Sequence, residues 1–190
     1  SLPCLDNNHD ISIVGTHLED NFIETFKKNK NFHTGLNTEI PEKVKVFKFE
    51  KFDELLSSKT DLIVLGISSK GIEWAADQLS RLYQGKQIPN LLMLTKGLSI
   101  YKNNYELLVD KLARLLINKG TNNLNISAVG GPCLAAGLAN RVHSSVIIAN
   151  KDIKTAKKTA DMLNTSYYHT SYSDDLNGVE VSAAIKNIFS

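Results

Sequence analysis

The sequence predicts an α/β fold, in which a doubly wound, mainly parallel sheet is flanked by helices. Short runs rich in β-branched residues alternate with longer amphipathic stretches. Several of these runs are apolar throughout, as in strands that are buried on both faces of a sheet. The repeated order of strand, helix and strand indicates right-handed crossovers between parallel strands.

Seven segments are expected to be strands, because they are short, apolar and followed by small or polar residues. They are Ile11–Val14, Val44–Phe49, Asp61–Gly66, Asn90–Thr95, Asn125–Val129, Ser145–Ala149 and the weaker candidate Ser166–Tyr172.

Six segments are expected to be helices, because apolar residues recur on one face or an acidic residue opens the segment. They are Leu18–Lys30, Gly71–Tyr83, Tyr105–Asn118, Cys133–Arg141, Asp152–Leu163 and Asp174–Phe189. Pro132 suits the start of the fourth helix, and Asp174-Asp175 suit the cap of the last one.

Composition excludes several classes of protein. The 190 residues carry a formal net charge of +2 without a basic stripe, so nucleic-acid binding is not expected. Cys4 and Cys133 are far apart and have no metal-ligand spacing, so neither a metal site nor a disulfide framework is expected. No apolar run reaches the roughly 20 residues of a membrane span. We expect a soluble, cytoplasmic protein that binds no membrane.

Two lysines stand out as candidate functional groups. Ligands of open α/β sheets bind beyond the carboxyl ends of the strands, and Lys96 follows an apolar strand directly. Lys186 lies one helical turn after Ser182 and Ala183, on a face of small residues. The alternative for both is a surface lysine whose stem crosses apolar atoms to reach water.

Three blocks of sequence, in order, carry a resemblance to a family. They are Leu94-Thr-Lys-Gly-Leu98, Val129-Gly-Gly-Pro-Cys-Leu-Ala135 and Ser173-Asp-Asp-Leu-Asn-Gly-Val-Glu-Val-Ser-Ala-Ala-Ile-Lys-Asn187. Together they resemble the NAD(P)-dependent glycerol-3-phosphate dehydrogenases, and the match runs along nearly the whole chain. The resemblance implies a Rossmann-like domain and hydride transfer between glycerol 3-phosphate and dihydroxyacetone phosphate, a reaction that supplies glycerophospholipid precursors.

The resemblance also implies roles for individual residues. Lys186 aligns with the family's proton acceptor and donor, and Lys96 with its second active-site lysine. The residues implied to contact substrate are Lys96, Gly131, Cys133, Lys186 and Asn187. Those implied to contact NAD or NADP are Thr16, His17, Phe32, Ser68, Lys96 and Ala135. Cys133 replaces the usual Ser, and a thiol is a weaker donor than a hydroxyl. His143 stands where the family often has Pro.

The same frame predicts which parts of the family's fold the chain contains. Residues 1–173 are expected to form the Rossmann-like domain with an incomplete first βα unit, because no Gly-x-Gly-x-x-Gly turn occurs. Residues 174–190 are expected to start a helix that leads to a C-terminal helical domain outside this sequence. Ile11–Val14 should then have one edge without a strand partner, and the chain alone should be inactive. A full-length homodimer is possible.

Two points remain open from sequence. Thr16 and His17 stand where strict NAD enzymes carry an acidic residue, and neither would repel a 2′-phosphate, so NADP is allowed beside NAD. The alternatives to the implied activity are a related 3-hydroxyacid or ketopantoate-type reductase, and a decayed homologue without catalysis.

Overall fold

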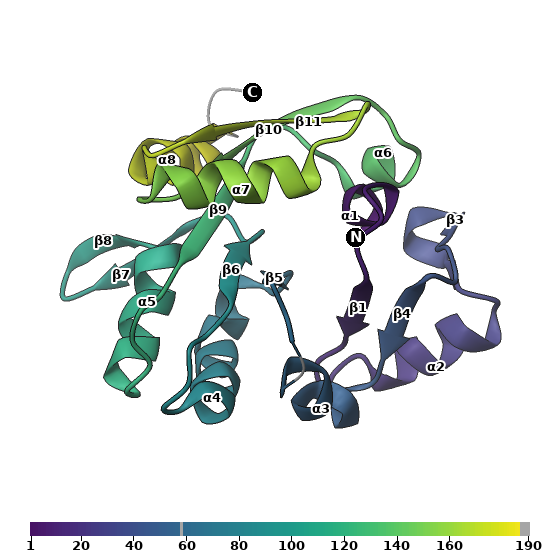
Figure 1. Cartoon of the computed structure of the whole chain (residues 1–190), viewed down its shortest axis with the longest axis horizontal. Helices are drawn as coiled ribbons and strands as arrows, with labels where there is room; N and C mark the ends of the chain where they lie inside the picture. Colours follow the sequence, from purple (N-terminus) through teal and green to yellow (C-terminus); the bar gives the residue numbers. More distant parts are fainter. Residues whose placement is uncertain (58, 187–190) are drawn as a thin grey trace. The chain divides into compact units, whose positions relative to one another are not determined.

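The computed structural model describes residues 1–57 and 59–186, which form two compact units (Figure 1). Unit 1 consists of residues 1–59, 132–145 and 161–170. Unit 2 consists of residues 60–131, 146–160 and 171–190. The predicted fold class is confirmed, because strands that are mostly parallel alternate with helices along the chain. The predicted division between residues 173 and 174 stays a prediction.

A five-stranded sheet has the strand order β11-β10-β9-β6-β5. Its strands are β5 (Leu62–Leu65), β6 (Asn90–Met93), β9 (Ile126–Gly130), β10 (Ser144–Ala149) and β11 (Tyr168–Ser173). β6 pairs in parallel with both β5 and β9, as the alternation of strands and helices predicts. β10 runs antiparallel to β9, a reversal that apolar runs alone do not reveal.

The helices of unit 2 bury apolar faces in its core. α4 (Ile72–Tyr83) and α5 (Leu108–Asn118) lie side by side and pack against each other (Figure 1). Leu79 of α4 and Leu112 of α5 are almost completely buried, as are Leu91 and Leu92 of β6. α8 (Leu176–Ile185) packs against β9. Burial of each large aliphatic side chain stabilises the fold by about 1.5–3 kcal/mol.

Unit 1 contains a smaller parallel sheet of two strands. β1 (Ile11–Val14) pairs with β4 (Val44–Phe47) along its whole length. As expected, the other edge of β1 has no strand partner among the described residues. Phe26 of α2 (Asp20–Lys28) packs with Ile40 and Val44 in a small core.

A further long helix, α7 (Ile153–Leu163), and several short elements complete the described chain. The short elements are α1 (Leu2–Asp6), β2 (Phe32–His33), η1 (Thr34–Leu36), β3 (Thr38–Glu39), η2 (Phe49–Lys51), α3 (Phe52–Ser57), η3 (Ser69–Gly71) and α6 (Ala135–Ala139). The predicted helix Cys133–Arg141 is therefore shorter than expected. The predicted helix Asp174–Phe189 forms from Leu176 to Ile185, and its last residues lie outside the described part.

One prediction at the start of α5 is wrong. Residues 105–107 belong to β8 (Asn104–Leu107), which forms an antiparallel hairpin with β7 (Leu98–Tyr101). The two turn residues, Lys102 and Asn103, have φ values of 49° and 63°. Such a turn usually contains Gly. The Lys102-Asn103 turn contains no Gly, and the leucines that follow it recur with a helical period. The sequence therefore predicted a helix in place of the second strand of the hairpin.

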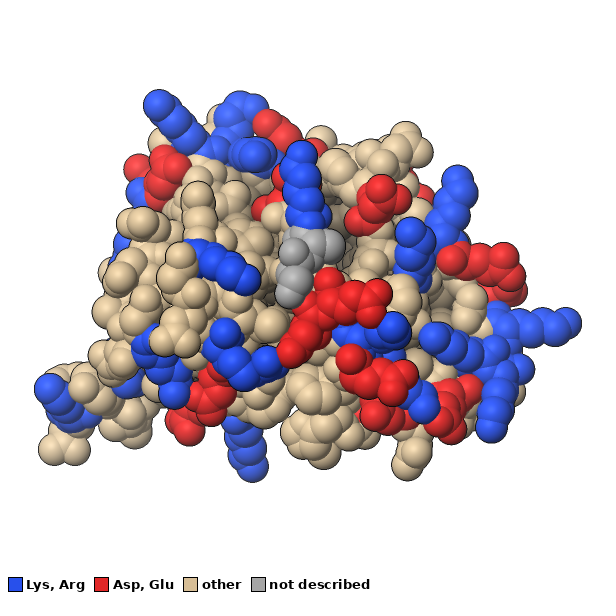
Figure 2. Space-filling view, turned by 60° about the horizontal axis from the view of Figure 1, so that its bottom comes forward, with Lys and Arg blue, Asp and Glu red and all other residues tan. Residues whose placement is uncertain are grey.

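The surface carries charges of both signs. Figure 2 shows Lys and Arg interspersed with Asp and Glu over the face in view. None of the helices in the described ranges combines the length and the apolarity needed to cross a membrane. Among the same residues, no group of three or more His, Cys, Asp or Glu side chains could hold a metal ion.

Candidate functional site at the carboxyl ends of the strands

The carboxyl ends of β5, β6 and β9 meet at one edge of the sheet in unit 2, because these three strands are parallel neighbours. Ser68 follows β5, Lys96 follows β6 and Gly131 follows β9. The Thr95 hydroxyl donates a hydrogen bond of 2.6 Å to the Ile67 carbonyl, which joins the first two loops. The structure therefore brings three of the predicted site residues to the same edge.

Lys96 reaches across this edge to the end of β9. Its Nζ donates a hydrogen bond of 3.0 Å to the Gly131 carbonyl oxygen. Gly97 and Gly131 have φ values of 134° and 121°, which L side chains rarely adopt. The backbone can therefore turn at both loops only with glycine, and these turns place the Lys96 amine beside the predicted substrate residue Gly131.

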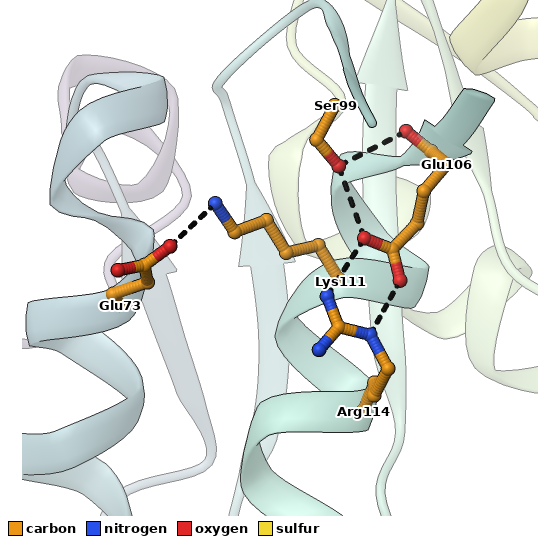
Figure 3. Close-up of polar contacts among 5 residues, drawn as sticks. All are labelled: Glu73, Ser99, Glu106, Lys111 and Arg114. Carbon is orange, nitrogen blue, oxygen red and sulfur yellow. Dashed lines mark hydrogen bonds and ion pairs between the residues drawn. The ribbon is translucent and has the colours of Figure 1, made fainter. Parts of the chain in front are cut away.

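The β7–β8 hairpin that follows Lys96 and Gly97 is fastened to α5. Glu106 accepts two hydrogen bonds from Arg114, of 2.7 and 2.9 Å, and one of 3.1 Å from the Ser99 hydroxyl (Figure 3). The Tyr101 ring lies 3.8 Å from the Arg114 guanidinium carbon, a cation–π contact. Bonds from Arg114 are also the main reason why the pKa of Glu106 is lowered. These contacts fix the β7–β8 hairpin against α5.

Figure 3 also shows that α5 is tied to α4. Lys111 of α5 makes an ion pair of 2.9 Å with Glu73 of α4. The Glu73 side chain is largely exposed, so this pair contributes at most about 1 kcal/mol.

A hollow of about 460 Å³ lies between the hairpin and α8. It is lined by Tyr101, Lys102, Asn104, Tyr105, Glu106, Leu107, Asp110, Asn177 and Val181. Neither Lys96 nor Gly131 lines it, so it is separate from the candidate site.

Lys186 stands at the C-terminal end of α8, and its side chain is exposed. The cap predicted for this helix is confirmed, since the Asp175 carboxylate accepts a hydrogen bond of 2.8 Å from the Gly178 N–H. α8 approaches β9 closely: a Cβ built on Gly130 would lie 2.7 Å from Val179 Cγ1. The convergence of Lys186 with Lys96 stays a prediction. Asn187 lies outside the described residues.

Glu180, one turn after Leu176 on α8, is a functional candidate that sequence reasoning did not single out. Its side chain is 4% exposed, and its Oε2 has no hydrogen-bond partner in the described structure. Burial raises the pKa of Glu180 to about 7, against the effect of a hydrogen bond from the Val109 N–H. The signal was available, because Glu180 is an acidic residue on the apolar face of a helix.

In unit 1, Thr16 and His17 follow the end of β1. The Glu19 carboxylate accepts hydrogen bonds from the Thr16 N–H (2.6 Å) and the Thr16 hydroxyl (2.5 Å). The His17 ring meets Phe49 edge-on, with 6.2 Å between ring centroids. The sequence predicts Glu19 near the start of a helix, and the structure confirms this, since Glu19 directly precedes α2 as its N-cap. The sequence did not indicate the hydrogen bonds from Thr16, which place an exposed carboxylate beside a predicted cofactor contact.

Three other predicted site residues also belong to unit 1. Phe32 lies in β2 and is partly exposed, Cys133 is a free thiol and Ala135 opens α6. Their predicted roles stay predictions.

Comparison with known proteins places the chain in a family. Residues 2–156 match the profile of the NAD-dependent glycerol-3-phosphate dehydrogenase N-terminus. The chain belongs to this family. An NADP(+)-dependent glycerol-3-phosphate dehydrogenase from Archaeoglobus fulgidus is 23% identical over 100% of the chain and 54% of that protein. A glycerol-3-phosphate dehydrogenase [NAD(P)+] from Rickettsia typhi is 35% identical over 68% of the chain and 38% of that protein.

Solved structures agree with the fold. The structure of glycerol-3-phosphate dehydrogenase from Coxiella burnetii superposes with a TM-score of 0.77 at 20% identity, over 98% of the chain and 53% of that protein. The chain therefore spans about half the length of the family members that match it end to end.

Proposed function

We propose that this chain is the nucleotide-binding part of a glycerol-3-phosphate dehydrogenase. The enzyme would interconvert sn-glycerol 3-phosphate and dihydroxyacetone phosphate by hydride transfer, with NAD or NADP. The observation that carries the proposal is the hydrogen bond from the Lys96 amine to the Gly131 carbonyl, at the carboxyl ends of the parallel strands β5, β6 and β9. Both residues lie inside the stretch that matches the family.

The residues of this chain would have the following roles in the reaction. Lys186 takes the proton of the substrate's C2 hydroxyl in oxidation and returns it to the carbonyl oxygen in reduction. The Lys96 ammonium donates a hydrogen bond to the same oxygen and stabilises the negative charge that develops there. Gly131 and Cys133 contact the substrate, together with Asn187.

The cofactor supplies or accepts the hydride when bound. Residues at the ends of β5 and β6 fit such a group. The end of β5 is open, since a Cβ on Gly66 would meet Leu94 at 3.9 Å and no nearer atom of the described residues, so a flat ring can approach the backbone there. Ser68 and Lys96 stand at the same edge. Thr16, His17, Phe32 and Ala135 would contact other parts of the cofactor. No glycine turn that could hold the pyrophosphate occurs in this sequence.

Glu19 bears on the choice between NAD and NADP. Its carboxylate already accepts the hydrogen bond of the Thr16 N–H, so a 2′-phosphate would have to compete for that donor. A carboxylate there also repels a phosphate, whereas it can accept hydrogen bonds from ribose hydroxyls. Within the proposal, NAD therefore binds more tightly than NADP. We further propose a cytoplasmic location, a role in phospholipid precursor supply and homodimer formation by the complete protein.

The test is a binding and substrate panel on the complete protein that contains this chain. Fluorescence titration with NADH and NADPH measures the two affinities. Oxidation of each is then followed with dihydroxyacetone phosphate, 2-ketopantoate and 3-oxoacids. Turnover with dihydroxyacetone phosphate alone supports the proposal. Preference for another carbonyl substrate indicates a related reductase, and cofactor binding without turnover indicates a non-catalytic homologue; either result rejects the proposed activity.

A further inference from the structure

The carboxyl group of Glu180 lies at the contact between α8 and the start of α5. The Val109 N–H, in the first turn of α5, donates a hydrogen bond to it. Val179, the preceding residue, meets Gly130 of β9. α8 is thus attached to its surroundings at two consecutive residues, and Lys186 follows Glu180 by six residues, about 9 Å along a helix.

The charged groups around Glu180 do not neutralise it. Asp110, on α5, raises the pKa of Glu180, while Lys151, after β10, lowers it. These two groups are already paired, with 3.0 Å between Lys151 Nζ and Asp110 Oδ1. On β8, the Glu106 carboxylate is bonded to Arg114. β9 contributes no titratable side chain, since it reads Ile-Ser-Ala-Val-Gly.

The helix itself carries further charges outside this contact. Asp175 caps the first turn of α8, Asp174 is exposed before it, and Lys186 is exposed at the other end. Among the described residues, an ionised Glu180 would therefore be a buried anion with one amide donor, one unsatisfied oxygen and no cation of its own. Such a group is costly to the folded state.

We propose that Glu180 is a positioning residue for Lys186: as a neutral carboxylic acid it holds α8 on α5, and its ionisation releases the helix end that carries the amine. The inference rests on the proposed function, because that function makes Lys186 the residue that transfers the proton. It adds to that function a pH limit, which arises from a residue that is not among the proposed substrate and cofactor contacts.

The sign of the pH effect follows from the direction of the shift. The pKa of Glu180 is raised from 4.5 to about 7 in the folded state. The folded helix therefore holds a proton that the released helix loses, so its attachment weakens as pH rises between these values. From pH 6 to pH 8, the ratio of released to attached helix should rise about tenfold.

Hydrogen exchange of the α8 amides at residues 181–186 measures this ratio, after correction for the intrinsic dependence of exchange on pH. In the wild-type chain the corrected rate should rise about tenfold from pH 6 to pH 8. In Glu180→Gln, which is neutral and similar in shape, it should change less than twofold. Asp174→Asn, which removes an exposed carboxylate near the same helix, should behave like the wild type. Equal pH responses in the wild type and Glu180→Gln would overturn the proposal.

Activity distinguishes positioning from stability alone. In the complete protein, kcat for dihydroxyacetone phosphate reduction should fall as pH rises from 6 to 8, relative to the Glu180→Gln variant. Identical pH profiles of kcat in the two proteins would overturn the positioning role even if hydrogen exchange differs. If neither protein turns over any substrate, the proposed activity fails, whereas the exchange experiment still decides whether Glu180 controls α8. Should Glu180→Gln not fold, Glu180→Leu provides the second neutral variant.

Discussion

Replacing Gly130 by alanine tests how closely α8 packs against β9. The new Cβ would lie 2.7 Å from Val179 Cγ1 and 3.5 Å from the Val179 carbonyl oxygen. Valine is restricted at χ1, so the helix rather than the side chain must shift. Overpacking of this kind costs about 1–3 kcal/mol, and the loss of glycine's freedom in the unfolded chain offsets about 0.4–1 kcal/mol of it. We expect a net destabilisation of about 1–2 kcal/mol.

The assay is urea unfolding of four proteins: wild type, Gly130→Ala, Val179→Ala and the double variant. If the clash is the cause, Val179→Ala removes it, and the double variant should be more stable than the sum of the single effects by about 1 kcal/mol. Gly66→Ala is the matched control, because its Cβ would meet only Leu94, at 3.9 Å. If Gly130→Ala leaves the free energy of unfolding unchanged, or if its effect adds strictly to that of Val179→Ala, this account of the contact between α8 and β9 is refuted.

Three other predictions concern polar contacts. Asp175→Ala removes the cap of α8 and should lower the free energy of unfolding by about 1 kcal/mol in urea titrations; no change would mean that the cap does not stabilise α8. Arg114→Ala leaves the half-buried Glu106 without its cation and should cost about 2 kcal/mol by thermal unfolding; a loss below 0.5 kcal/mol would argue against a fastened hairpin. Tyr167→Phe removes the 2.5 Å hydrogen bond to Asp6 and should cost about 1 kcal/mol. Hydrogen bonds from Arg141 and, after it, from Tyr167 keep the pKa of Asp6 low, so the stability that the Tyr167 bond gives is lost as pH falls through the folded pKa. The variant's penalty should therefore shrink in acid, and a penalty that grows in acid would contradict the assignment.

The strands of the five-stranded sheet, the pair β1 and β4, and most of the longer helices could be predicted from sequence, because burial leaves a direct trace in the residues. β6 is the clearest case: Leu91, Leu92 and Met93 are apolar in sequence and almost completely buried in the structure. The direction of β10 could not be predicted, since the residues of a strand do not encode which way its neighbour runs. The β7–β8 hairpin was missed because Lys102 and Asn103 make a turn that usually needs glycine.

The candidate site was predictable in part. The rule that ligands bind beyond strand ends identified Lys96 and Gly131, and the structure joins them through one hydrogen bond. The roles of Glu19 and Glu180 depend on where their carboxylates point, which only the folded chain reveals. A pattern of small residues selected the face of Lys186, but the position of its amine relative to Lys96 depends on tertiary structure that sequence spacing does not determine.

The most direct test of the account replaces Lys186 in the complete protein. Lys186→Met keeps a side chain of similar length and removes the amine that is proposed to carry the proton. We expect kcat for dihydroxyacetone phosphate reduction to fall at least about 10²-fold, with NADH affinity by fluorescence titration unchanged. Lys158→Met, which alters an exposed lysine of α7, is the control and should retain wild-type kcat. A Lys186→Met enzyme that keeps kcat within twofold of wild type would contradict the proposed mechanism.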